Sequence, residues 1–359
     1  MNINTHTLKR SVLKVFVIFF CTSLPLLVGQ KPYKVGTTAV PIFEIGFGTA
    51  GNAMGDARVA STTGIESILW NPAGIALTDG HEFLVLNQPW LIDINTGFAG
   101  VIVDIPQVGK IGLSMVYADY GEMEVTTMNQ QNGTGELFTA NDYVMALSFA
   151  RKLAAWFSLG VNLEYFSSSI YHESANAIAA DLGVIVKTDF FSSTGDREDG
   201  LTIGMSINNY GAPMEYEGKD LMTPVDILDD EDGNYGNVLG RLDLAEWELP
   251  LYFRIGASLN PIVTQNSRML FEIDAVHPND NSEYINLGGE YSYTQSSFGT
   301  FFLRAGYKGL FMEDSEYGLT AGGGVKVFMM GNRNIQVEYS YRDVGALGIS
   351  HSYSIQYGF

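Results

Sequence analysis

From about residue 82 to the C-terminus, apolar and polar side chains alternate with a period of two residues. Between residues 157 and 165, for example, every odd position is apolar or aromatic, and every even position is Ser, Gly, Asn or Glu. Successive side chains of a β-strand point to opposite faces of the sheet. The pattern therefore predicts strands with one apolar and one polar face.

About fourteen such strands follow one another along the chain. They cover residues 82–90, 95–105, 110–120, 141–151, 154–167, 175–189, 200–211, 250–259, 267–276, 283–294, 299–308, 316–329, 333–343 and 349–359. Most are longer than the usual strand of about 5–6 residues, and about 9–11 tilted residues span a bilayer. An even number of strands closed on itself leaves no unpaired edge in lipid. The pattern predicts an all-β fold: a closed antiparallel transmembrane β-barrel of about 14 strands.

The connections between the predicted strands differ in length. Residues 106–109, 152–153 and 330–332 form short turns, whereas residues 121–140 and 212–249 form long loops. Short periplasmic turns and long extracellular loops are typical of outer-membrane barrels. The connection at residues 190–199 is longer than this rule predicts.

Aromatic residues near strand ends predict girdles at the two membrane interfaces. They are the pairs Tyr117 and Tyr120, Tyr291 and Tyr293, and Tyr339 and Tyr341. In the alternative, a soluble β-sandwich, these aromatics would form the core and the second face would be richly charged. That face instead carries Gly, Ser and Asn with a few charges, which is typical of a closed lumen. The charges predicted to face the lumen, and to pair with one another or with the N-terminal segment, are Glu164, Arg254, Glu290, Arg304 and Glu338.

Composition narrows the function classes. The formal net charge is −20, 46% of the residues are hydrophobic and there is one cysteine. The charge argues against nucleic-acid binding, because phosphates would not be neutralised. The apolar content excludes a disordered chain, and one cysteine excludes a disulfide scaffold.

Residues 1–30 have the features of an export signal. Lys9, Arg10 and Lys14 precede a mainly apolar stretch, and a cut is expected near Gln30. An uncleaved membrane anchor is the alternative, but Pro25 interrupts the stretch, which is shorter than the ~20 residues of a spanning helix. We therefore expect export to the bacterial outer membrane through a cleaved signal peptide.

The chain ends in an amphipathic strand whose apolar positions are Tyr353, Ile355, Tyr357 and Phe359. A terminal Phe on such a strand resembles the insertion signal that the barrel-assembly machinery recognises. We expect these residues to direct insertion into outer-membrane lipid.

No motif for catalysis stands out. Gly46, Gly48 and Gly51 match GxGxxG, but no strand–helix–strand unit follows that would make it a dinucleotide site. The acidic loop 226–237 is similar to a calcium loop but has Leu228 and Leu239 where an EF-hand needs acidic ligands. We expect no catalytic residue, no cofactor and no metal, with calcium at this loop left as an alternative.

Two short motifs precede the first strand. The run Gly51-Asn52-Ala53-Met54-Gly55-Asp56-Ala57 and the later Trp70-Asn71-Pro72-Ala73-Gly74 resemble the start of the PorV/PorQ family and of the related FadL-like outer-membrane transporters. The final strands also resemble that family. The resemblance implies a 14-stranded barrel with an inward-folded plug, in which residues 67–70 form a short helical turn. The plug motif is Gly51, Met54, Gly55, Trp70, Asn71, Pro72, Ala73 and Gly74; for Asn71 and Pro72, turn chemistry is favoured over ligand contact.

These observations predict a signal peptide at residues 1–30, a plug or hatch at 31–80 and an outer-membrane barrel at 81–359. The resemblance implies a non-catalytic accessory component of a type IX-like secretion or surface-attachment system, with a translocon and exported cargo proteins as partners. A FadL-like channel for hydrophobic small molecules is the alternative, and a passive structural protein is a third hypothesis.

Overall fold

The computed structural model describes residues 35–92, 94–192, 194–227 and 238–359. The predicted signal peptide and most of the calcium-like loop, residues 228–237, lie outside the described residues. No helix among the described residues is long and apolar enough to span a bilayer.

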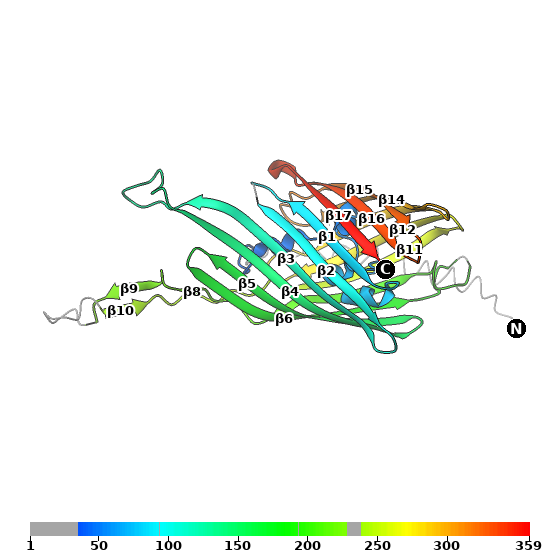
Figure 1. Cartoon of the computed structure of the whole chain (residues 1–359), viewed down its shortest axis with the longest axis horizontal. Helices are drawn as coiled ribbons and strands as arrows, with labels where there is room; N and C mark the ends of the chain where they lie inside the picture. Colours follow the sequence, from blue (N-terminus) through cyan, green and yellow to red (C-terminus); the bar gives the residue numbers. More distant parts are fainter. Residues whose placement is uncertain (1–34, 93, 193, 228–237) are drawn as a thin grey trace.

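Fourteen antiparallel strands form the wall of a barrel (Figure 1). They are β1 (Glu82–Pro89), β2 (Asn95–Ile105), β3 (Gly109–Glu124), β4 (Leu137–Ala154), β5 (Phe157–Ile170), β6 (Glu173–Lys187), β7 (Thr202–Gly211), β11 (Tyr252–Val263), β12 (Ser267–Pro278), β13 (Tyr284–Gln295), β14 (Gly299–Leu310), β15 (Leu319–Phe328), β16 (Asn334–Asp343) and β17 (Ile349–Gly358). Each lies on one of the segments predicted from the alternation.

The sheet closes on itself. The first strand, β1, pairs with the last, β17, from Glu82 opposite Gly358 to Asn87 opposite Tyr353. The pairing of β5 with β6 completes the ring. Every strand of the wall therefore has two hydrogen-bonded neighbours, which satisfies the backbone where no water is present.

Alternation decides which face each side chain takes. On β5, Leu163 is 56% exposed on the outer surface, whereas its neighbour Glu164 is 7% exposed and faces the lumen. The prediction of an apolar outer face is confirmed. The inner face is polar only in part, because apolar side chains such as Phe98 and Phe166 also face the lumen and pack against residues that precede β1. Tyr120 is a correction: it lies on the inner face, where its hydroxyl donates to Asp142 Oδ2 at 2.5 Å. It is three residues from Tyr117, so the two side chains point to opposite faces and cannot share one girdle.

Loop length differs between the two ends of the barrel. At the end where the chain leaves β17, the connections at 106–108, 155–156, 264–266, 296–298 and 329–333 are short. The turn predicted at 152–153 is displaced, because β4 continues to Ala154. The connection at 188–201 is a long exception at this end. At the opposite end, the loops at 125–136 and 212–251 are long, so we assign that end to the cell exterior.

Residues 35–80, here called the N-terminal segment, precede β1. They contain the short helices η2 (Pro41–Ile45), α2 (Thr49–Ala53), α3 (Ser67–Trp70) and η3 (Pro72–Leu77). The short helical turn predicted at 67–70 is confirmed. Helix α2 contacts β14 to β17 and η3 contacts β3 to β6, so the segment lies inside the barrel and reaches both sides of its wall.

The inner wall differs in composition around the barrel. Along β1 to β6 apolar side chains alternate with buried polar and charged ones such as Glu164, and Phe98 and Phe166 pack there with Ile65, Ile68 and Ile75 of the N-terminal segment. Along β12 to β16 it carries buried charges, among them Glu272 and Arg304. The segment therefore rests on an apolar core on one side and on polar contacts on the other.

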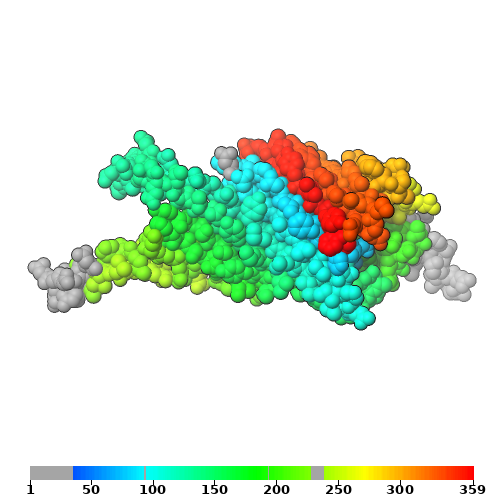
Figure 2. Space-filling view, viewed as in Figure 1, coloured from blue at the N-terminus to red at the C-terminus, as the bar shows by residue number. Residues whose placement is uncertain are grey.

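The long loop predicted at 212–249 spans residues 212–251 and contains further strands. The short β8 (Glu217–Gly218) pairs with β6, and β9 (Met222–Val225) pairs with β10 (Val238–Arg241). A last short helix, η4 (Gly345–Leu347), lies in the loop before β17. In the space-filling view the β9–β10 hairpin and the loop after β3 project from the same end of the barrel (Figure 2).

Candidate functional site

The N-terminal segment approaches the wall where strand residues are glycine. A Cβ built on Gly160 would lie 2.2 Å from the carbonyl carbon of Pro72, and one on Gly306 would lie 2.2 Å from that of Met54. Further lumen-facing glycines have the same close approach to segment atoms, within 2.1–2.7 Å: Gly183, Gly204, Gly288 and Gly322. No side chain fits at these positions without displacing the segment. The wall and the segment are thus complementary in shape at one level of the lumen.

Asp56 is the centre of one buried ion cluster. Its carboxylate pairs with Lys308 Nζ at 2.7 Å and with the guanidinium of Arg342. Asp56 is 5% exposed and each of the two cations 2%. Lys308 also donates to the carbonyl of Ile45 at 3.0 Å, and Arg342 donates to Asn52 Oδ1 at 2.5 Å. The cluster ties the segment to β14 and β16.

A second cluster centres on Arg304 of β14. Its Nε donates to Glu290 Oε2 at 2.6 Å, and its Nη1 donates to Glu338 Oε1 at 2.6 Å. Arg58 of the N-terminal segment lies 3.9 Å from Glu290. The structure therefore brings three of the predicted lumen charges together.

The other two predicted lumen charges are not in this cluster. Arg254 donates to Asn208 Oδ1 at 3.1 Å, and its guanidinium lies 4.5 Å from the ring centre of Tyr252. Glu164 is buried, and Arg254 and Glu164 line the same small cavity of about 60 Å³. They form no ion pair with each other within the described part of the chain.

Carboxylates also hold the backbone of the segment. On β12, Glu272 Oε1 accepts from Ala60 N–H at 2.6 Å, and Asp274 Oδ2 accepts from Arg58 N–H at 2.7 Å. On β1, Glu82 Oε2 accepts from Ile65 N–H at 2.9 Å. These contacts satisfy amide groups that irregular, buried backbone would otherwise leave unpaired.

Glu66 also accepts hydrogen bonds from backbone amides, but it belongs to the segment itself. Its Oε1 accepts from Thr49 N–H at 2.8 Å, at the N-terminus of α2. Burial raises the pKa of Glu66 to about 7, and the negative charge of nearby Glu338 adds to the rise. The carboxyl of Glu66 therefore titrates near neutral pH.

The predicted plug motif is packed in the lumen. Asn71 caps η3: its Oδ1 accepts from Ala73 N–H at 3.1 Å, and its Nδ2 donates to the carbonyls of Val59 and Val184 at 2.8 and 3.0 Å. Pro72 occupies the first turn of η3, where its missing N–H costs nothing. These contacts fit the interpretation of Asn71 and Pro72 as turn chemistry. The remaining motif residues are also buried in this packing: Gly51, Met54, Gly55, Trp70, Ala73 and Gly74.

The predicted insertion-signal residues lie at the end of β17. Tyr353, Ile355 and Phe359 are 50%, 60% and 49% exposed, and Tyr357 lies on the same outer face. The backbone N–H of Phe359 donates to the carbonyl of His81 at 3.0 Å, which extends the seam between the first and last strands.

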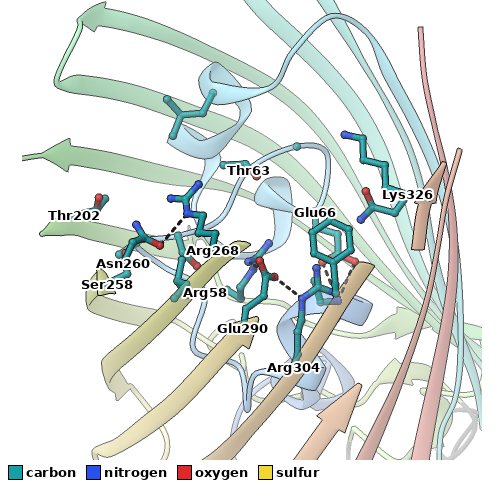
Figure 3. Close-up of a pocket in the computed structure, with 18 of the residues that line it drawn as sticks. Arg58, Thr63, Glu66, Thr202, Ser258, Asn260, Arg268, Glu290, Arg304 and Lys326 are labelled. Carbon is teal, nitrogen blue, oxygen red and sulfur yellow. Dashed lines mark hydrogen bonds and ion pairs between the residues drawn. The ribbon is translucent and has the colours of Figure 1, made fainter. Parts of the chain in front are cut away.

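Two of the cavities that border the N-terminal segment share no lining residue. One, here called the polar cavity, has a volume of about 240 Å³ and is lined by charged and polar side chains, including Arg58, Arg268 and Glu290 (Figure 3). The other is the small cavity lined by Arg254 and Glu164. A further cavity, of about 860 Å³, shares Glu82 and Lys326 with the polar cavity. Across the described ranges, no group of three or more His, Cys, Asp or Glu residues is arranged to hold a metal ion.

The extracellular hairpin exposes apolar side chains. Ile227, Leu239 and Leu242 are 59%, 67% and 53% exposed, and Trp247 in the following stretch is 42% exposed. Leu239 lies on β10, and the other three side chains lie in the stretches that flank β9 and β10. Exposed apolar clusters of this kind mark interaction surfaces.

Sequence reasoning did not single out Asp56, Lys308, Arg342 or Glu66 as site residues. A usable signal was present for two of them, because Lys308 and Arg342 are charged residues at polar, lumen-facing positions of strands. Asp56 and Glu66 lie outside the alternating pattern, and only the folded segment shows what they contact.

Comparisons with known proteins add two findings. A family model described as type IX secretion system protein PorV matches residues 29–227. No curated protein sequence matches the chain significantly.

Several solved structures share the fold. The Ralstonia pickettii toluene transporter TbuX has a TM-score of 0.53 at 11% identity, covering 87% of this chain and 97% of that chain. The Pseudomonas putida toluene transporter TodX has 0.52 at 11%, with 87% and 97% covered. A Pseudomonas aeruginosa FadL homologue has 0.50 at 13%, with 91% and 99% covered. At these identities the similarity shows a common barrel architecture and no more.

Proposed function

This chain belongs to the PorV family of type IX secretion system proteins, and from that premise we propose that it binds exported proteins and their translocon at the cell surface without catalysing a reaction. The protein is a β-barrel of the bacterial outer membrane associated with type IX secretion. The family match agrees with the resemblance of the Gly51–Ala57 and Trp70–Gly74 motifs.

Partner binding is assigned to the extracellular hairpin, and its exposed apolar side chains are the observation that carries the proposal. The strands β9 and β10 project beyond the end of the barrel wall (Figure 1), so lipid does not account for the exposure of Leu239 on β10. An apolar cluster rimmed by polar side chains, such as Arg241 with Glu215 and Glu217, is the usual composition of a transient protein interface.

We further propose that residues 1–30 are removed as a signal peptide, that residues 31–80 act as a plug and that residues 81–359 form the barrel. The fit of Gly160 and Gly306 to the segment and the buried Asp56 cluster support the plug. In this proposal the N-terminal segment keeps the lumen closed, and the hairpin binds partner proteins outside it. The last strand, ending in Phe359, serves recognition by the barrel-assembly machinery.

The experiment replaces Ile227 and Leu239 by Ser in the full-length protein and measures secretion of exported proteins and their co-purification with the barrel. Both residues are exposed, so the barrel is expected to assemble normally. Met330, 95% exposed in a turn at the opposite end, gives the matched control Met330→Ser. Lost co-purification in the hairpin variant with a normal control supports the proposal; equal recovery in both contradicts it.

A channel for hydrophobic solutes is the second candidate, favoured by the barrel architecture shared with the toluene transporters. The buried ion clusters and the close fit of the N-terminal segment argue against a continuous apolar passage. A deletion strain distinguishes the two. Normal protein export with lost uptake of hydrophobic compounds would favour the channel and overturn partner binding.

A further inference from the structure

The polar cavity lies in the lumen between the N-terminal segment and residues of β1, β6, β7 and β11 to β17; Figure 3 shows part of this lining. Its volume is about 240 Å³. Six basic side chains and five carboxylates line it, in a chain of net charge −20. Arg304 already pairs with Glu290 and Glu338. The other five basic residues are Arg58, Lys187, Arg197, Arg268 and Lys326.

Most carboxylates around this cavity already have partners. Glu66 and Glu82 accept from backbone N–H groups of the N-terminal segment. Glu290 and Glu338 accept from Arg304 at 2.6 Å each. Within the described part of the chain, Glu198, in the connection after β6, is the only lining carboxylate that accepts neither kind of hydrogen bond.

The basic side chains, by contrast, have fewer hydrogen-bond and ion-pair partners. Arg268 donates from Nε to Asn260 Oδ1 at 3.0 Å. Arg58 is 7% exposed, its Nε is buried with no hydrogen-bond partner among the described residues, and its nearest carboxylate, on Glu290, is 3.9 Å away. Lys187 and Arg197 form no side-chain ion pair within the described ranges. A buried guanidinium N–H without a partner is costly.

We propose that this cavity binds a small oxyanion, a phosphate- or carboxylate-bearing solute that enters from the periplasmic end. Guanidinium groups donate in a planar fork that matches both anions. The volume admits such an anion together with several waters, since one water occupies about 30 Å³ in the liquid. Arg58 belongs to the N-terminal segment and Arg268 to the wall, so a bound anion joins the two and strengthens the hold on the segment.

The test uses the detergent-folded full-length protein. Thermal melting and calorimetric titration are followed with inorganic phosphate and with succinate, against sodium chloride at equal ionic strength. We expect saturable stabilisation by at least one oxyanion, and Arg268→Gln is expected to weaken its affinity by about tenfold, the usual effect of losing a charged hydrogen bond. Comparing the two titrations shows whether phosphate or carboxylate is the preferred chemistry.

Arg241 supplies the matched control, because it is exposed on the extracellular hairpin and already pairs with Glu215 and Glu217. Arg241→Gln should bind the oxyanion as the unchanged protein does. If Arg268→Gln does not migrate as a folded barrel on an unheated gel, Lys187→Gln, at the end of β6, decides instead. Stabilisation no greater than that by chloride, or unchanged affinity in the folded wall variant, would overturn the proposal. Neither result bears on partner binding at the hairpin.

Discussion

Replacing Asp56 by Asn tests whether the buried ion cluster holds the N-terminal segment. Asp56 has a backbone φ of 63°, a left-handed conformation that Asn adopts nearly as well as Asp. The substitution keeps the size and shape of the side chain and removes only the negative charge. Lys308 and Arg342, each 2% exposed, then remain without their carboxylate.

The expected cost follows from that burial. Removing one partner of a buried ion pair costs about 3–5 kcal/mol, because the remaining charge stays uncompensated. Here two cations lose the same partner, and the carbonyl of Ile45 and the amide of Asn52 retain only part of the interaction. A loss of about 3–5 kcal/mol raises the population of the detached segment by about two to three and a half orders of magnitude, at tenfold per 1.4 kcal/mol.

Three measurements report whether the N-terminal segment has detached from the barrel wall. If the segment acts as the plug proposed above, planar-bilayer recordings should show a higher ion conductance than the unchanged protein gives. Limited proteolysis should cut between residues 46 and 80, and acrylamide should quench the fluorescence of Trp70, which is 2% exposed in the structure. The barrel itself should remain folded on an unheated gel.

Asp79→Asn is the control, because Asp79 is an exposed carboxylate of the same segment. It should behave as the unchanged protein in all three measurements. If Asp56→Asn matches Asp79→Asn in conductance, proteolysis and Trp70 quenching, the Asp56 cluster does not hold the segment and the reasoning from buried charge is wrong.

Two further predictions concern the same packing. Gly306→Ala places a methyl group 2.2 Å from the carbonyl carbon of Met54 and should lower the melting temperature and raise the ion conductance. Gly289→Ala, where the nearest atom to the added methyl group is 3.5 Å away, should change neither. Equal effects of the two substitutions would contradict the close-approach argument. The pKa of Glu66, about 7 in the folded protein against 4.5 unfolded, means that the folded state holds its proton more tightly, so this group's stabilising contribution falls as pH rises from 4.5 through 7. Glu66 alone should make the protein about 1 kcal/mol more stable at pH 6 than at pH 8, and Glu66→Gln should remove that part of the slope in melting scans; an unchanged slope would show that other groups cause it.

The strands of the wall could be predicted because a barrel in lipid imposes one rule on every strand. Leu163 and its outward neighbours must be apolar, and Glu164 and its inward neighbours escape that requirement. The rule acts residue by residue, so a single sequence displays it. Where the rule was set aside the prediction was wrong, as for Tyr120, which was grouped with Tyr117 by position along the strand although the two alternate.

The candidate site was harder to predict, because its contacts join residues far apart in the chain. Arg304, Glu290 and Glu338 were identifiable as lumen charges, but their pairing depends on the register of β13 to β16. The alternation does place Gly306 on the inner face and Gly289 on the outer face. It does not show that Gly306 meets the backbone of Met54, which only the folded segment reveals.

By itself, the sequence determined the barrel, its strands, its short and long connections and its family resemblance, since alternation and short motifs are local properties. The tertiary structure alone decided how the N-terminal segment fits the glycine positions of the wall, which charges meet Asp56, and why basic groups such as Arg58 gather at one cavity. These features depend on closure, because the ring of strands brings Arg342 of β16 and the segment around Asp56 together across most of the chain length.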